Sequence, residues 1–451
     1  MAIIDEVTGS HTRRQPPVTI EELPDSPCEA QPQPSTESAT APPPDSSFAA
    51  QLKAIASRLV PPDDPSGPAF QRTAAAALRE LATAVTSPEW DKLSREDQSA
   101  AFLPAILLNF PSPLSPPSSP SSQPLVIPTP PDASSLALHL LQHPLRTTFS
   151  HPHLSAGTRA RSRPHGGPNA MDDLHDDSAW KTPGVDNALA WCASQLSASE
   201  VERHLSLLLP PTLTMMDDWQ PMWRDRGARV LASWIDKVDP EELRRRGLDT
   251  LLLKSLTHTL SLHNDPPLYH VFPVTLSIAE HLEGERKALA YADIVDRALV
   301  VGWTYASSSA VTVLVDIAQN AEALIGVLGA GVARWLKSIV PSLLAPLQHE
   351  PTPNRLGLYA ANLSTLLALL KTLRGAGRVD RWRGRILDVV ARVWVQVGKY
   401  GYSGKEKATA DDVLGLTRDV YAEVAAQCPS VKTHEFAQLR ALDSCFVPLV
   451  A

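Results

Sequence analysis

The sequence has few cysteines, and they do not form a recognisable set. Four occur in 451 residues, at Cys28, Cys192, Cys428 and Cys445. None is paired at the short spacing of a zinc ligand set, and four scattered thiols do not indicate a disulfide framework. These absences favour a protein of a reducing compartment, without a structural metal site.

Long apolar runs are also scarce. No stretch of about 18 or more apolar residues escapes interruption by charge or proline, so no membrane span is expected. The first residues, MAIIDEVTGS, carry acids where a secretory signal needs basic residues and an apolar core. The net charge is only −8, with both signs interspersed, which disfavours direct binding of nucleic acid. We expect a cytoplasmic protein, with the nucleus as an alternative location.

The motifs of common enzymes are missing. Gly401 and Gly404 lack the Walker spacing, and the pair Gly329 and Gly331 has no third glycine and no strand before it. No Gly-x-Ser-x-Gly elbow is found. We therefore predict no catalytic residue and no cofactor. One alternative is a metal-dependent enzyme that uses the His- and Asp-rich segment 151–177, although its spacings match no common zinc pattern.

Composition divides the chain. Residues 1–46 are rich in Pro, Ser, Glu and Gln and are predicted to be a disordered tail. Residues 47–110 are predicted to be an N-terminal helical segment, 111–133 a Pro/Ser-rich linker and 151–177 a flexible loop. Serines that precede proline are candidates for proline-directed phosphorylation in exposed chain. They are Ser26, Ser87, Ser112, Ser115 and Ser119.

Residues 134–451 are predicted to be almost continuously helical. Ser197 and Glu200 have the spacing of a capping box, and Asp239-Pro240 provides an N-cap followed by proline at the first helical position. No pair of strands with a hairpin turn is found, so the fold class is all-α. Helices are expected near 48–60, 70–85, 100–108, 134–145, 201–209, 239–247, 248–262, 266–282, 285–301, 307–318, 320–328, 331–349, 353–374, 379–397 (ended by Gly398), 410–427 and 432–447. Their irregular period predicts an irregular HEAT/armadillo-like α-solenoid.

The stretch from Leu207 to Ile235 is the most informative. It predicts a helix that starts at Pro210-Pro211, a turn at Asp217-Asp218, and a second helix after Pro221. Two short amphipathic helices with a tight turn cannot bury their apolar faces alone. Neighbouring helices must cover them, as in a helical repeat.

This stretch resembles the HEAT-repeat pattern, in which an Asp precedes an apolar residue with Arg and then small residues, here Trp223-Arg224 and Gly227-Ala228. More narrowly, the proline-rich helix start, Asp217-Asp218 and Arg226-Gly227 are similar to the Tel-two-interacting protein two family. A second patch, Pro183-Gly184 followed by Leu189 and Trp191, resembles the segment that precedes the Asp-Asp pair in that family. The resemblance covers Trp180 to roughly Leu282.

The resemblance implies a non-catalytic scaffold, the smallest subunit of the Tel-Tti-Tti co-chaperone (TTT) complex. Its partners would be the large first Tti HEAT-repeat protein and Tel-two and, indirectly, the ninety-kilodalton heat-shock chaperone and the RuvB-like ATPases. The complex would mature phosphatidylinositol-3-kinase-related kinases and so support DNA-damage, telomere and nutrient signalling. Burial of apolar surface of the C-terminal helices on the first Tti protein is the expected contact. An alternative is a generic HEAT/armadillo adaptor in transport or phosphatase scaffolding.

Eight residues of these patches are candidate partner-binding positions: Pro183, Gly184, Trp191, Asp217, Asp218, Trp219, Arg226 and Gly227. For the two aspartates we expect local structure, with one carboxylate capping the next helix and pairing with Arg224 or Arg226. Trp219 is either a partner anchor or core packing between repeats.

A basic run flanks Trp382 and has two interpretations. It is either a surface for an acidic partner or a solvated helix edge. Its members are Arg374, Arg378, Arg381, Arg383 and Arg385.

Overall fold

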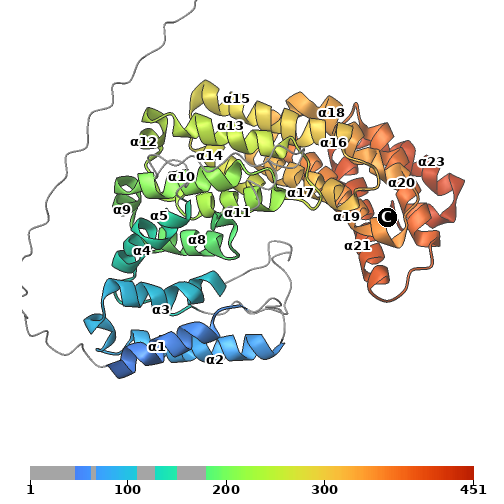
Figure 1. Ribbon diagram of the computed structural model, residues 1–451. Helices are drawn as coiled ribbons and strands as arrows, with labels where there is room; N and C mark the ends of the chain where they lie inside the picture. Colours follow the sequence, from blue (N-terminus) through green and yellow to red (C-terminus); the bar gives the residue numbers. More distant parts are fainter. Residues whose placement is uncertain (1–45, 62–67, 109–126, 150–178, 451) are drawn as a thin grey trace, which may run out of the picture. The chain divides into compact units, whose positions relative to one another are not determined.

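The computed structural model describes residues 46–61, 68–108, 127–149 and 179–450 (Figure 1). Within these ranges all regular structure is helical, which confirms the all-α fold class. Apart from Ser46, the predicted tail of residues 1–46 lies outside the described residues. So do the predicted loop of residues 151–177 and most of the linker of residues 111–133.

The N-terminal helices share a core with the helices that follow. They are α1 (Ser46–Arg58), α2 (Pro68–Val85), α3 (Arg95–Leu108), α4 (Ala133–Gln142) and α5 (Pro144–Phe149). α3 packs against α4 and against α8 (Val185–Gln195). Buried side chains of α1 to α3, among them Leu59, Phe102 and Ile106, belong to one hydrophobic cluster with those of the central helices. The chain from Ser47 to Ala451 is therefore one compact unit.

The central helices form short antiparallel pairs. They are α9 (Ala198–Arg203), α10 (Leu205–Met216), α11 (Pro221–Ala232), α12 (Pro240–Arg245), α13 (Leu248–Leu260), α14 (Val271–Glu280), α15 (Gly284–Ile294) and α16 (Val301–Tyr305). α10 packs against α11, α11 against α14, and α13 against α14. The predicted capping box is confirmed, because the Ser197 backbone N–H donates to Glu200 Oε2 at 2.8 Å. The predicted Asp239 cap is also confirmed, with Oδ1 accepting the Glu241 N–H at 2.9 Å.

Two predicted boundaries in this region are wrong. α10 begins at Leu205, so Pro210 and Pro211 lie inside the helix and not in its first turn. Proline has no backbone N–H, so two carbonyls in the first turn of α10 have no hydrogen-bond donor within the helix. The helix tolerates this because Pro210 is exposed. The helices predicted at 307–318 and 320–328 are one helix, α17 (Val311–Leu328). Asn320 does not interrupt it, because its side chain donates to Asp316 one turn earlier, at 2.9 Å.

The C-terminal helices form a second hydrophobic cluster. They are α18 (Leu336–Leu344), α19 (Leu356–Thr372), α20 (Arg383–Lys399), α21 (Gly404–Gln427), α22 (Ser430–Thr433) and α23 (Glu435–Leu442). α19 packs against both α17 and α21 (Figure 1). The predicted stripe of α20 is confirmed, since Ile386, Val390 and Val393 are buried. Gly398 does not end this helix, and the helix predicted at 432–447 is broken into two at His434.

One described stretch, Val311–Gln348, is long and apolar enough to cross a membrane by length and composition. It consists of α17, a 3-10 segment (Gly329–Trp335), α18 and a final 3-10 turn. Ile317 and Leu324 of α17 and Leu343 of α18 are buried in the hydrophobic clusters. Part of this apolar stretch therefore packs against neighbouring helices, with 39% of its most apolar window buried.

Candidate protein-interaction site

Asp218 holds the turn between α10 and α11 from two directions. Its Oδ1 accepts the backbone N–H of Gln220 at 2.9 Å, which closes the turn locally. Its Oδ2 lies 3.1 Å from Lys181 Nζ, and the two side chains are only 4% and 9% exposed. Because a buried charge needs an opposite charge beside it, this ion pair fixes the residues before α8 to the turn. Asp217, next to it, is exposed.

The predicted arginine partner is wrong. Asp218 makes the local hydrogen bond expected of a turn aspartate, but it pairs with Lys181. Arg224 instead donates to Asn264 at 3.1 Å. The Arg226 guanidinium lies 4.5 Å from the centre of the Trp223 ring, and its burial lowers the pKa of Arg226. Sequence spacing suggested the arginines because they follow the turn directly, whereas the lysine comes from an earlier segment.

Aromatic rings surround this ion pair. Trp180 meets Trp223 edge to face with centroids 5.2 Å apart, and Phe149 stacks on Trp180 at 5.9 Å. Lys181 Nζ lies 5.4 Å from the Trp180 ring centre and 5.6 Å from that of Trp219. Trp180 and Trp223 are buried, but Trp219 remains 54% exposed. The turn therefore presents one tryptophan to solvent from a rigid base.

Two glycines of the candidate set are explained by close backbone packing. Gly184 has φ +87°, and a Cβ atom there would lie 2.2 Å from the Leu107 carbonyl oxygen of α3. A Cβ atom on Gly227 would lie 2.7 Å from the Met216 backbone nitrogen, where α11 crosses the end of α10. Any larger residue would push these elements apart.

Of the remaining candidate residues, some pack against other helices and others are exposed to solvent. Trp191 is half-buried and packs on Phe102 of α3, with ring centroids 5.1 Å apart. Pro183 is exposed in the turn before α8. Gly184 and Trp191 therefore attach α8 to α3, and Asp217 and Trp219 are the motif residues of the α10–α11 turn that face solvent.

Sequence reasoning missed two buried aspartates whose polar contacts lie along α11. Arg229 pairs with Asp186 of α8, whose side chain is only 2% exposed. Asp225 accepts two hydrogen bonds from His270, one from its backbone N–H at 2.7 Å and one involving Nδ1 at 2.8 Å. Asp186 lies just before the apolar run of α8, and this local mismatch is a signal that could have found it. Asp225 lies between Arg224 and Arg226, so the local sequence carries no such signal for its burial.

Beside Trp219, further apolar side chains are exposed in or next to three inter-helix loops, those of α10–α11, α13–α14 and α16–α17. We call these residues the apolar loop edge: Trp219, Met222, Leu262, Tyr269 and Tyr305. Their exposed fractions run from 39% to 78%. Exposed aromatic side chains on a rigid framework are typical anchors of protein interfaces.

Two polar contacts hold these loops side by side. Arg224 at the start of α11 donates to Asn264 of the α13–α14 loop. Thr312 at the start of α17 donates to Asp265 of the same loop at 3.2 Å. The α10–α11, α13–α14 and α16–α17 loops therefore form one continuous surface.

Other predicted sites have separate outcomes. Of the Ser-Pro serines, Ser87 alone is in the described part of the chain. It is half-buried in the ordered turn after α2, where its Oγ accepts the Glu89 N–H at 3.3 Å, so the prediction of exposed, disordered chain is wrong there. Across the described ranges, no group of three His, Cys, Asp or Glu side chains is arranged to hold a metal ion. The His- and Asp-rich segment 151–177 lies outside those ranges.

An all-helical framework that presents exposed aromatic side chains on adjoining loops is typical of a protein-binding protein. The comparison with family models identifies which kind. Residues 123–353 match the model of the Tti2 family, and the chain belongs to that family. The match includes both the Pro183-Gly184 patch and the Asp217-Asp218 turn, so the sequence resemblance is confirmed. No curated protein matches the chain. Family membership indicates a protein-binding subunit of the Tel-Tti-Tti co-chaperone complex.

Proposed function

We propose that this chain is a non-catalytic scaffold subunit that binds the large first Tti protein and Tel-two. Within that assembly it supports the chaperone-dependent maturation of phosphatidylinositol-3-kinase-related kinases, in the cytoplasm and in the nucleus. The ninety-kilodalton heat-shock chaperone and the RuvB-like ATPases would act through the complex and not through this chain directly. The family match over residues 123–353 supports this assignment over a generic HEAT/armadillo adaptor.

The structural observation that carries the proposal is the exposure of Trp219 on a turn that the buried Lys181–Asp218 pair holds in place. A scaffold binds through side chains that are ordered before the partner arrives, because less entropy is then lost on binding. The paired packing of α10 with α11, α13 with α14, and α19 with α17 and α21 supports a HEAT-like solenoid, whose loops line up along one edge.

The C-terminal helices provide a second apolar surface. Leu442 of α23 is 76% exposed and Val447 is 48% exposed. Both lie beyond the buried core of α20 and α21. We assign them to the predicted contact of the C-terminal helices with the first Tti protein, in addition to the contact made by the apolar loop edge.

Co-purification of partners with surface variants tests the proposal. Trp219→Ala combined with Met222→Ala removes two exposed anchors without touching the core, so the variant should fold normally and recover at least about fivefold less partner. Leu289→Ala is the control, because Leu289 is equally apolar and 61% exposed, but lies on α15 away from these loops. Full partner recovery by the double variant would contradict the proposed edge.

A further inference from the structure

A concentrated positive charge lies outside the matched family segment, which ends at residue 353. Residues 371–385, which we call the basic loop, connect the end of α19 to the start of α20. They contain six cationic side chains and one carboxylate, a net charge of +5 in a chain of net charge −8. The rest of the chain therefore carries −13.

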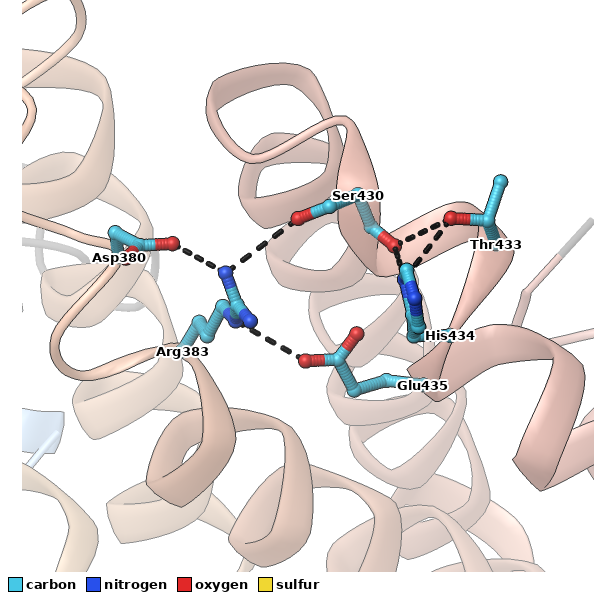
Figure 2. A network of polar contacts seen from close by, with 6 residues as sticks. All are labelled: Asp380, Arg383, Ser430, Thr433, His434 and Glu435. Carbon is cyan, nitrogen blue, oxygen red and sulfur yellow. Dashed lines mark hydrogen bonds and ion pairs between the residues drawn. The ribbon is translucent and has the colours of Figure 1, made fainter.

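Carboxylates of the neighbouring helices neutralise two of these cations. Arg374 pairs with Glu423 of α21, whose side chain is only 6% exposed, and this contact lowers the pKa of Glu423. Arg383 lies between Asp380 and Glu435, donating to Glu435 Oε1 at 3.0 Å (Figure 2). Its Nη1 also donates to the Ser430 hydroxyl at 3.4 Å.

Four cations are left over. These are Lys371, Arg378, Arg381 and Arg385, all of them exposed. None of their side chains has a hydrogen-bond or ion-pair partner among residues 46–61, 68–108, 127–149 and 179–450. Two of the six basic residues thus hold helices together. Lys371 lies in the last turn of α19 and near the charge of Glu423, which offsets part of its repulsion. The other three have no compensating contact within the described chain.

The arginines also lie at the end of a helix where positive charge is unfavourable. The N-terminus of a helix carries a partial positive charge, so acidic residues are favoured there and basic residues are disfavoured. α20 has no acidic residue in its first turn, and Arg381, Arg383 and Arg385 lie at or next to that turn. A bound anionic group would relieve the repulsion from both the side chains and the helix end.

The basic loop is held rigidly. Val379 is 3% exposed, and Trp382 packs on the C-terminal hydrophobic cluster. Gly375 and Gly377 adopt positive φ angles of +82° and +63°, which allow the chain to turn sharply between α19 and Val379. Gln427 donates to the Leu370 carbonyl at 2.6 Å and so fixes the end of α21 to the end of α19.

We propose that the basic loop binds a short acidic segment, rich in Asp and Glu, of a partner protein. Arginine guanidinium groups match carboxylates in pairs of parallel hydrogen bonds, and a rigid loop loses little entropy on binding them. A long polyanion such as a nucleic acid would extend beyond the loop into the field of the acidic remainder of the chain. A short segment stays within about one Debye length, roughly 8 Å, of the four free cations. This inference does not depend on the proposed function, because it uses no residue of the family-matched segment.

Binding of a labelled peptide to the full-length protein tests the inference. The probe is a short fluorescein-labelled peptide rich in glutamate, followed by anisotropy at low and moderate salt. We expect saturable binding that weakens with salt, and no binding of the same peptide with each glutamate replaced by glutamine. The triple variant Arg378→Gln/Arg381→Gln/Arg385→Gln should bind at least about tenfold more weakly, since each exposed charge pair contributes a modest share.

The matched control removes three arginines elsewhere. Arg244 and Arg245 of α12 and Arg246, directly after it, are also exposed, but each pairs with Glu241 or Glu242. Their replacement by Gln changes the net charge equally and should leave peptide affinity within about twofold. An equal loss in both variants would overturn the proposal, because net charge alone would then explain binding. Tighter binding of a single-stranded oligonucleotide of the same charge would overturn it too. A lowered Tm of the loop variant would contradict the claim that these arginines do not stabilise the fold.

Discussion

Two neighbouring aspartates of the α10–α11 turn have opposite environments. Asp218 is buried, accepts a backbone N–H and pairs with Lys181, whereas Asp217 is exposed to solvent. The pair is therefore not a matched acid–base or metal-binding couple. One carboxylate builds the turn, and the other is available to a partner.

Asp218→Ala should be strongly destabilising and Asp217→Ala nearly neutral. Removal of the Asp218 carboxylate leaves the Lys181 ammonium buried without its counter-charge, which costs about 2–4 kcal/mol of the free energy of unfolding. An exposed aspartate contributes less than about 0.5 kcal/mol. Urea unfolding of the two variants beside the wild type measures the difference. Equal midpoints would show that the Lys181–Asp218 pair does not hold the turn.

The residue types of this turn were predictable, but their partners were not. The Asp-Asp pair, the tryptophans and the glycines all stand out in the sequence. The partners Lys181, Asp186 and His270 come from segments about 40 residues away in the chain for each pair. Such contacts depend on how helices pack, which a local pattern of spacing does not contain.

The contact of α10 with α11 depends on a glycine within a helix. A glycine in the middle of a helix normally costs stability relative to alanine, because it loses more backbone entropy on folding. Gly227 is kept because α11 approaches the Met216 backbone too closely for a Cβ atom. The geometry of the helix pair, and not the helix itself, requires this residue.

Gly227→Ala should lower stability and Gly326→Ala should raise it. Both residues lie inside helices, but no heavy atom lies within 4 Å of a Cβ atom added at Gly326. Alanine at Gly326 should therefore gain up to about 1 kcal/mol, while the clash at Gly227 should produce a net loss of about 1–3 kcal/mol. Thermal unfolding of both variants provides the comparison. A stabilised Gly227→Ala protein would contradict the close packing of α10 on α11.

Helix positions were predicted better than helix ends. The apolar stripe of α20 and the caps at Ser197 and Asp239 follow from local rules, and the structure confirms them. The predicted start of α10 was wrong because a double proline is typical of the first turn of a helix. In the structure the helix begins at Leu205, because leucines that precede the prolines are buried. Tertiary packing outweighed the local preference.

For the whole molecule, one half-buried carboxylate should make stability depend on pH. Asp316 of α17 faces a cavity of about 30 Å³ that His263 and Asn264 also line. Burial raises the pKa of Asp316 to about 6, although the hydrogen bond from Asn320 acts in the opposite direction. In the unfolded chain the same group loses its proton near pH 3.8. The folded state therefore binds more protons between these two values, and its stability falls as pH rises from about 4 to about 6.

The substitution Asp316→Asn should remove this loss of stability with rising pH. The variant should be more stable than the wild type by on the order of 2 kcal/mol above pH 7, and the difference should vanish near pH 4, where the wild-type carboxyl is protonated. Urea unfolding across this range measures it. Asp412→Asn, at an exposed position of α21, should follow the wild-type profile. A constant offset at all pH values would mean that the charge of Asp316 is not the cause.

At the same scale, the fold class and the family could be predicted from the sequence, and both are confirmed. The packing of helices α1, α2 and α3 on the central helices could not be predicted. Residues 109–126 separate the two groups in the sequence, and composition alone does not show which helix faces meet. The apolar loop edge could not be predicted from the sequence either. Its members come from three loops far apart in sequence, and only the contacts through Asn264 and Asp265 place those loops together.

The central claim is that this chain is a scaffold subunit of the Tel-Tti-Tti complex. The most direct measurement is affinity purification of the tagged full-length protein from its native cells at moderate salt, with quantitative mass spectrometry. We expect a large helical-repeat protein, the first Tti subunit, and Tel-two to be recovered in amounts nearly equal to the tagged chain. Recovery of neither protein would contradict the proposed function and leave the helical fold without an assigned partner.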